Sequence, residues 1–139
     1  MSENMVHCLR WTCILFLAVE WLGFGVCHFL FREATEAQVP DYFPYKTVIA
    51  VLTGLAELVA GVLILIPRVG EWESRRWAAI LSLVLLSLYI PAVYNLLVND
   101  AAVGGSESFR RVVRIILVPN NLILALCALY LLWDGSGRP

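Results

Sequence analysis

Four long apolar stretches constrain this chain more than any other feature of its sequence. Each is long enough to cross the hydrocarbon core of a bilayer as a helix, which takes about 20 residues. We expect these spans at about residues 11–31, 47–66, 77–98 and 111–133. The sequence therefore predicts an all-α fold, an integral membrane four-helix bundle that forms one domain over residues 1–139.

The composition agrees with a chain whose surroundings are lipid. Hydrophobic residues make up 60% of the sequence, charged residues 15%, and the mean hydropathy is +0.79. Too few polar residues remain to coat a water-facing surface. The net charge of −1 and the placement of Lys and Arg near span ends argue against nucleic acid as a partner. The bilayer is the expected partner, and the four cysteines form no CxxC pair that would indicate a metal site.

The first apolar stretch has a competing interpretation as a cleaved signal peptide. The apolar region of a signal peptide is shorter than this one and is followed by small residues at a cleavage site. Residues 27–31, Cys-His-Phe-Leu-Phe, offer no such site. We therefore interpret the stretch as an uncleaved span.

The connections and the prolines give further expectations. Residues 32–46 mix charged side chains with Pro40 and Pro44 and are predicted to form an interfacial loop. Pro91 removes one helical hydrogen bond, so we expect a kink in the third span. Pro119 is a second candidate kink, in the fourth span.

Four spans place both termini on the same side of the membrane. Five basic residues lie on each side, so the positive-inside rule gives no clear orientation. If Arg114 is drawn into the bundle and discounted, the terminal side holds the excess. We therefore predict cytoplasmic termini, in the cell or inner membrane if the source is bacterial.

Two carboxylates, Glu20 and Glu57, lie inside the predicted spans. Counting residues from the span ends gives both the same depth, near the midplane, and Asn120 and Asn121 fall close to that layer. A charged carboxylate at the bilayer centre costs about 2.5 to 3.5 kcal/mol on insertion scales. We expect each glutamate to be protonated, paired, or sharing a proton with the other.

A second polar layer is predicted nearer the 32–46 connection. Its members lie near the far ends of their spans: His28, Tyr94, Asn95 and Arg114. A bis-histidine haem is excluded within the chain, because His7 lies 21 residues before His28, which is about 30 Å along a helix. A bond from His28 to a carbonyl or phosphate is the simpler expectation.

Two interpretations of the buried polar residues stay open. In one, the glutamates and asparagines form a hydrogen-bonded cluster that fixes how the helices pack. In the other, they line a small binding site or a proton path, which is the usual hypothesis for an ionisable group inside a membrane.

Several short motifs, in order along the chain, resemble the DoxX-like family of small four-helix membrane proteins. They are residues 25–29 (GVCHF), 39–44 (VPDYFP), 53–57 (TGLAE) with Gly61 and 66–68 (IPR), and 90–95 (IPAVYN). The resemblance covers about residues 10–133 and implies a four-helix bundle in which His28, Glu57 and Pro91 are positions of the family pattern. The fourth span departs from the family's Arg-Leu-Pro-Leu-Gln, because Arg114 lies five residues before Pro119.

The resemblance implies three kinds of role. The first is an auxiliary or structural subunit whose polar layer binds a lipid or quinone headgroup or fixes helix packing. The second is a quinone-linked oxidoreductase subunit, in which His28, Arg114 and Glu57 bind the quinone and pass its protons. The third is an assembly chaperone or scaffold for a larger membrane complex. The sequence has no nucleotide-binding loop and no Ser-His-Asp set, which disfavours catalysis by this chain alone.

Overall fold

The computed structural model describes residues 2–67, 73–98 and 107–135. Over these ranges the chain is helical and contains no strand. The helices are α1 (Glu3–Leu30), α2 (Arg32–Gln38), α3 (Lys46–Leu65), α4 (Ser74–Val98) and α6 (Glu107–Gly135). Four of them, α1, α3, α4 and α6, are long and apolar enough to cross a membrane. The all-α bundle expected from the sequence is confirmed.

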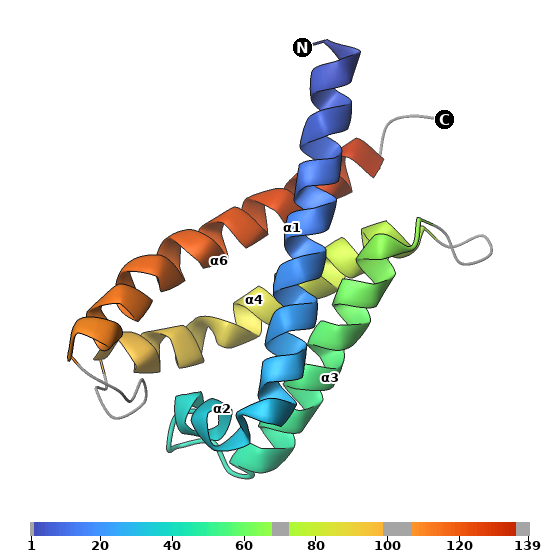
Figure 1. Cartoon of the computed structure of the whole chain (residues 1–139). Helices are drawn as coiled ribbons and strands as arrows, with labels where there is room; N and C mark the ends of the chain where they lie inside the picture. The colour runs from blue at the N-terminus through green and yellow to red at the C-terminus, as the bar shows by residue number, and fades with distance from the viewer. Residues whose placement is uncertain (1, 68–72, 99–106, 136–139) are drawn as a thin grey trace.

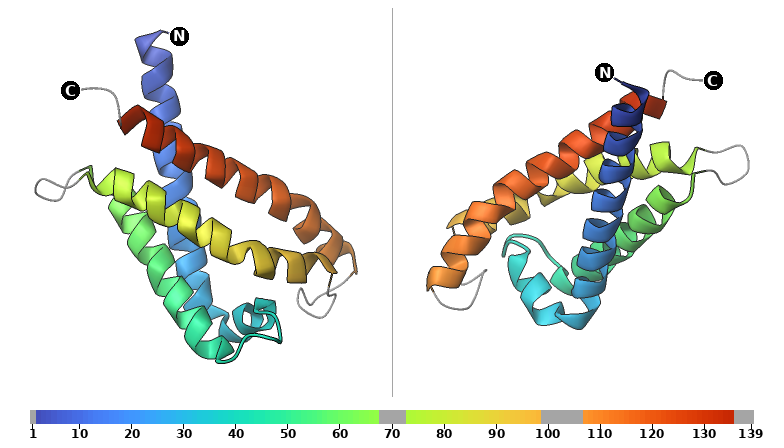
Figure 2. Two further views of the ribbon diagram at one scale, coloured as in Figure 1. Left: turned by 180° about the vertical axis from the view of Figure 1, so that it is seen from behind. Right: turned by 45° about the horizontal axis from the view of Figure 1, so that its top comes forward.

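The four long helices form two pairs that cross. Helix α1 packs along α3, α4 packs along α6, and contacts between α3 and α4 and between α1 and α6 close the ring. Figure 1 shows α4 and α6 running obliquely across α1 and α3, and Figure 2 shows the same crossing from behind. The start of α1 and the end of α6 lie at the end of the bundle where α3 stops and α4 starts.

The helices are apolar on nearly every face, so lipid can cover their outer sides while their inner sides pack together. Large side chains such as Ile14, Leu17, Trp21, Ile64 and Leu124 are fully buried. Many equally apolar side chains, among them Leu and Val residues of every long helix, are exposed on the outside. A water-soluble bundle would place polar residues on these outer faces.

Glycines bring α1 and α3 into close contact. A Cβ added at Gly54 would lie 2.6 Å from the Cβ of His28, and one added at Gly61 would lie 2.7 Å from Cγ of Leu22. Gly25 is equally crowded by the Leu58 side chain. Membrane helices use such small residues to approach each other, because lipid tails provide no hydrophobic drive for helices to associate.

The predicted 32–46 loop differs from the structure, which contains the short helix α2. Arg32 and Glu36 are one turn apart on α2, and their side chains pair at 2.7 Å. The Thr47 hydroxyl of α3 also donates to Glu36, at 2.8 Å, which ties α2 to α3. These hydrogen bonds, the one from Arg32 first, lower the pKa of the Glu36 carboxyl from its ordinary value. Helix α1 likewise starts at Glu3, eight residues before the predicted span.

The prolines lie within continuous helices. Pro91 is inside α4 and Pro119 is inside α6, and neither ends its helix. Figure 2 shows α4 bending in its second half, the part that holds Pro91. The kink expected in the third span agrees with this bend.

Candidate functional site

Glu57 is the most deeply buried ionisable group that the structure describes, with 1% of its surface exposed. The hydroxyl of Tyr89, on α4, donates a hydrogen bond to its Oε1. The Nε2 atom of His28, on α1, lies 3.4 Å from its Oε2. Three helices therefore each contribute one side chain to a cluster that we call the Glu57 cluster: His28, Glu57 and Tyr89.

The predicted depth of His28 is corrected by this contact. His28 was expected in a layer apart from Glu57, because it lies near the far end of its predicted span. His28 lies beside Gly54, three residues before Glu57 on α3. Side chains on a helix lean toward its N-terminus. Because α1 and α3 are antiparallel, the side chains of His28 and Glu57 lean toward each other and close the gap.

The chemistry of the Glu57 cluster follows from its donors and acceptors. Tyr89 can only donate its single proton to the carboxylate, so it fixes the position of Oε1. Oε2 of Glu57 and Nδ1 of His28 are buried and have no hydrogen-bond partner among the described residues. A proton can reside on Glu57 Oε2 or on His28 Nε2 with little movement of either side chain. The arrangement can therefore hold a proton between two helices.

A second buried contact supports the first. The indole Nε1 of Trp21 donates to the Ser82 hydroxyl at 2.8 Å, and Ser82 donates in turn to the carbonyl of Ala78 at 2.8 Å. The rings of Trp21 and Tyr89 lie 6.4 Å apart, centroid to centroid. Neither Ser82 nor Tyr89 was predicted from the sequence as a site residue. Their seven-residue spacing, which places them on one face of α4, was the available signal.

Glu20 does not share the surroundings of Glu57, which corrects the predicted common layer. Leu22 contacts Gly61, so the closely packed helices place Glu20 about six residues, or about 9 Å, from Glu57 along the axis. The Nδ2 atom of Asn120, on α6, donates to Oε2 of Glu20 at 3.3 Å. The two carboxylates are thus bound to different helices. The prediction of equal depth is wrong, and of the three expectations for the glutamates the one in which they share a proton is not met.

The other predicted site residues have separate roles. Asn121 donates to the carbonyl of Leu117 on its own helix at 2.7 Å. At the opposite end from the termini, Asn95 donates to the Gln38 carbonyl and Arg114 to the Leu96 carbonyl, each at 3.1 Å. These two bonds fasten α2 to α4 and α4 to α6. Tyr94 is 64% exposed and takes no part in the Glu57 cluster.

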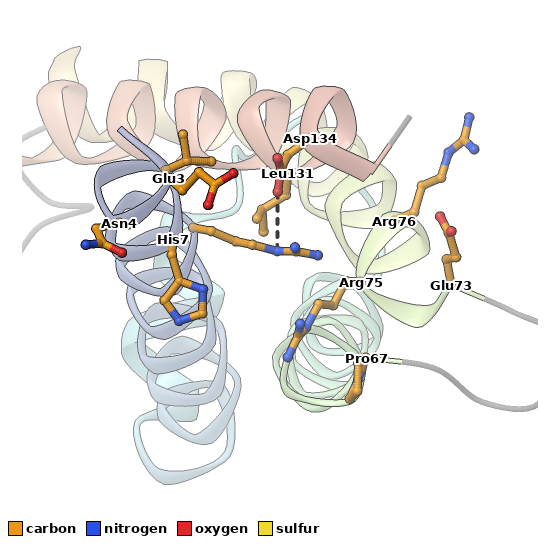
Figure 3. A pocket seen from close by; sticks show the side chains of 11 residues that line it. Glu3, Asn4, His7, Pro67, Glu73, Arg75, Arg76, Leu131 and Asp134 are labelled. Carbon is orange, nitrogen blue, oxygen red and sulfur yellow. Dashed lines mark ion pairs between the residues drawn. The ribbon is translucent and has the colours of Figure 1, made fainter. Parts of the chain in front are cut away.

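The terminal end of the bundle contains a polar hollow of about 620 Å³. It lies between the starts of α1 and α4 and the ends of α3 and α6, as Figure 3 shows. Arg10 crosses it to Asp134, with Nε 3.3 Å from Oδ2. No site was predicted here from the sequence, because charged residues are common at the ends of membrane spans.

The Glu57 cluster supplies fewer ligands than a metal ion needs. Among the residues that the structure describes, no three His, Cys, Asp or Glu side chains come together to hold a metal ion. His28 and Glu57 supply two groups, whose geometry suits the sharing of a proton.

Comparison with known proteins places the chain at the level of a family. No curated protein and no solved structure matches it. A family model does match, over residues 17–132, a range that includes every member of the Glu57 cluster. The chain therefore belongs to the family described as a domain of unknown function (DUF8561).

Proposed function

We propose that the protein is an auxiliary, non-catalytic subunit of a larger membrane complex, in which the Glu57 cluster fixes how α1, α3 and α4 pack. The observation that carries this proposal is the burial of Glu57 at 1% exposure, with neighbours from two other helices. A carboxyl group this deeply buried in a membrane protein is tolerated only when hydrogen-bond partners offset the free-energy cost of its desolvation. A register-fixing polar contact is a well-attested use of such groups.

The DoxX-like resemblance supports the same proposal. His28 and Glu57 are two of the positions that this chain shares with the pattern of that family, and their side chains lie 3.4 Å apart. We propose that the chain is of DoxX-like type and that the shared pattern preserves this contact. The fold-level likeness alone carries no activity.

The structural role is tested by replacing Glu57, the hydrogen-bond acceptor, and Tyr89, the donor, first singly and then together. Glu57→Leu removes the carboxyl oxygen to which the Tyr89 hydroxyl donates, so we expect a lower unfolding temperature in detergent. Adding Tyr89→Phe removes that hydroxyl as well, and replacing both partners of a buried bond by apolar groups is nearly neutral. The double variant should therefore be more stable than Glu57→Leu. A double variant less stable than either single one would contradict the proposal.

A quinone-binding role is the second candidate. It is favoured by Nδ1 of His28 and Oε2 of Glu57, two buried polar atoms without a well-formed hydrogen bond among the described residues, because a quinone oxygen can accept a hydrogen bond and a quinol hydroxyl can donate one. Mass spectrometry of lipid extracts from gently purified wild-type protein and Glu57→Gln separates the two roles. We expect the same lipid background in both. A quinone retained by the wild type and lost from Glu57→Gln would establish the second role instead.

A further inference from the structure

The hollow at the terminal end lies outside the Glu57 cluster and has a different chemistry. Among the described residues, charged side chains of both signs line it: Arg10, Arg75 and, at its edge, Arg76, with Glu3, Glu73 and Asp134. Its volume of about 620 Å³ falls within the usual range of small-molecule sites. A hollow with charges of both signs suits a ligand that carries both a cation and an anion.

The anionic side of the hollow is held by Asp134. Its side chain is 8% exposed, and its buried Oδ2 has no hydrogen-bond partner, although Nε of Arg10 lies 3.3 Å away. Asp134 is near the C-terminus of α6, where the helix dipole is negative and an anion is unfavourable. A cationic hydrogen-bond donor beside Oδ2 would offset both effects. Glu3 lines the same side of the hollow in Figure 3.

The cationic side is held by Arg75. Its Nε donates to the carbonyl of Ile64 at 3.1 Å, and its guanidinium lies 5.3 Å from the centre of the Trp11 ring. These contacts fix the side chain, and because the first uses Nε, the Nη donors can serve a ligand. A planar guanidinium recognises phosphate with paired hydrogen bonds. Figure 3 shows Arg75 directed into the hollow and Arg76 directed away from it, and Arg10 lines the hollow beside Asp134.

Exposed tryptophans mark the end of the bundle that contains the hollow. Three tryptophans at the same end of the bundle have exposed rings: Trp11 at 43%, Trp77 at 49% and Trp133 at 74%. Exposed tryptophans are enriched at the membrane–water interface. A lipid phosphate and its substituent would therefore reach the hollow from the adjacent leaflet.

We propose that the hollow binds the phosphoethanolamine headgroup of a membrane phospholipid. The phosphate contacts Arg75 and Arg10, and the primary ammonium donates to Asp134 and Glu3. A singly anionic headgroup brings no cation of its own to Asp134, whose ion-pair partner Arg10 would also contact the phosphate. A choline headgroup has a quaternary ammonium with no N–H to donate to Oδ2. Free phosphoethanolamine has the same charged groups as the lipid headgroup, but it lacks the acyl chains that would lie beside the exposed tryptophans.

Native mass spectrometry of the full chain in detergent tests this proposal. The protein is titrated with phosphatidylethanolamine, phosphatidylcholine and phosphatidylglycerol that have identical acyl chains. We expect phosphatidylethanolamine to bind about tenfold more tightly than the other two, the effect of about one charge-assisted hydrogen bond. Asp134→Asn gives the hollow one extra positive charge, so its preference should move to phosphatidylglycerol. Arg75→Gln should weaken phosphatidylethanolamine binding about tenfold.

The matched control is Arg111→Gln, the same chemical change at the other end of the bundle. The Arg111 side chain is 75% exposed and pairs loosely with Glu107 at 3.9 Å, so lipid selectivity should not change. Equal binding of the three lipids by the wild type, or unchanged selectivity in Asp134→Asn, would overturn the proposal. Competition by free phosphoethanolamine at the affinity of the lipid would assign the site to a soluble ligand and overturn the lipid source. If Arg75→Gln does not fold, Asp134→Asn alone decides.

Discussion

Tyr89 is the residue on which the surroundings of Glu57 depend most directly. Its hydroxyl donates to Oε1, and its ring packs near Trp21. We predict that Tyr89→Phe lowers the free energy of unfolding by about 0.5 to 2 kcal/mol, because the ring stays and only the hydrogen bond is lost. Unfolding of the purified protein in mixed micelles measures the change.

Tyr94→Phe is the matched control on the same helix. Tyr94 is 64% exposed, so loss of its hydroxyl should leave stability within experimental error. Equal losses in the two variants would mean that the Tyr89 hydroxyl contributes nothing specific to the cluster.

At this scale the sequence identified Glu57, Glu20 and the Glu20 partner Asn120, but not the hydroxyl that donates to Glu57. These three residues were found because polar residues inside apolar spans are conspicuous. His28 was assigned to the wrong layer for two reasons: counting from span ends missed the offset of about six residues between α1 and α3, and it ignored the lean of side chains along a helix. Tyr89 was overlooked because an aromatic ring in an apolar span looks like ordinary packing until the position of its hydroxyl is known.

The contact between helices α1 and α3 is the helix–helix contact most sensitive to small increases in side-chain volume. A methyl group at Gly54 would lie 2.6 Å from the Cβ of His28, so the helices would have to separate. We predict that Gly54→Ala costs about 1 to 3 kcal/mol of stability and also draws His28 away from Glu57. Thermal unfolding in detergent measures the cost.

Gly23→Ala provides the comparison on α1 itself. Nothing lies within 4 Å of a Cβ at Gly23, and alanine favours a helix by about 1 kcal/mol over glycine. The Gly23→Ala variant should be at least as stable as the wild type. If the two alanine variants were equally stable, the close approach of α1 to α3 would not be the feature that holds the pair together.

The existence of the four long helices could be predicted from the sequence. The structure of the short connections and the first residues of the helices were less predictable. Long apolar runs require helices in a bilayer, which is why all four spans were found. Helix α2 was missed because Pro40 and Pro44 drew attention to turns, although the Arg32–Glu36 spacing was a helical signal. Helix α1 starts at Glu3. The two turns before the predicted span contain too many polar residues for hydropathy to assign them to a membrane helix.

For the whole molecule, the arrangement of four spans predicts which residues share a side of the membrane. We expect a cysteine at position 2 to react from one side of sealed vesicles, and cysteines at positions 45 and 107 from the other. The residues concerned, Ser2, Tyr45 and Glu107, are all exposed, so labelling does not require opening of the bundle. A membrane-impermeant maleimide, applied to variants without native cysteines, provides the measurement. Labelling of all three positions from one side would contradict the four-span arrangement.

The same measurement in vesicles of known orientation tests whether the termini are cytoplasmic, which stays a prediction.

The crossing of the α1–α3 pair by the α4–α6 pair could not be predicted from the sequence (Figure 1). In water, the polar face of a helix would indicate which side turns inward. Here nearly every face is apolar, so packing shape and a few hydrogen bonds decide the arrangement.

The order in which the three side chains of the Glu57 cluster are synthesised has a consequence for biogenesis. His28 enters the membrane with α1, before Glu57 arrives on α3, and Tyr89 follows on α4. During insertion Glu57 therefore meets an imidazole first, and the phenol completes its surroundings one helix later. The α1–α3 hairpin can thus leave the translocon with its costliest residue already sheltered.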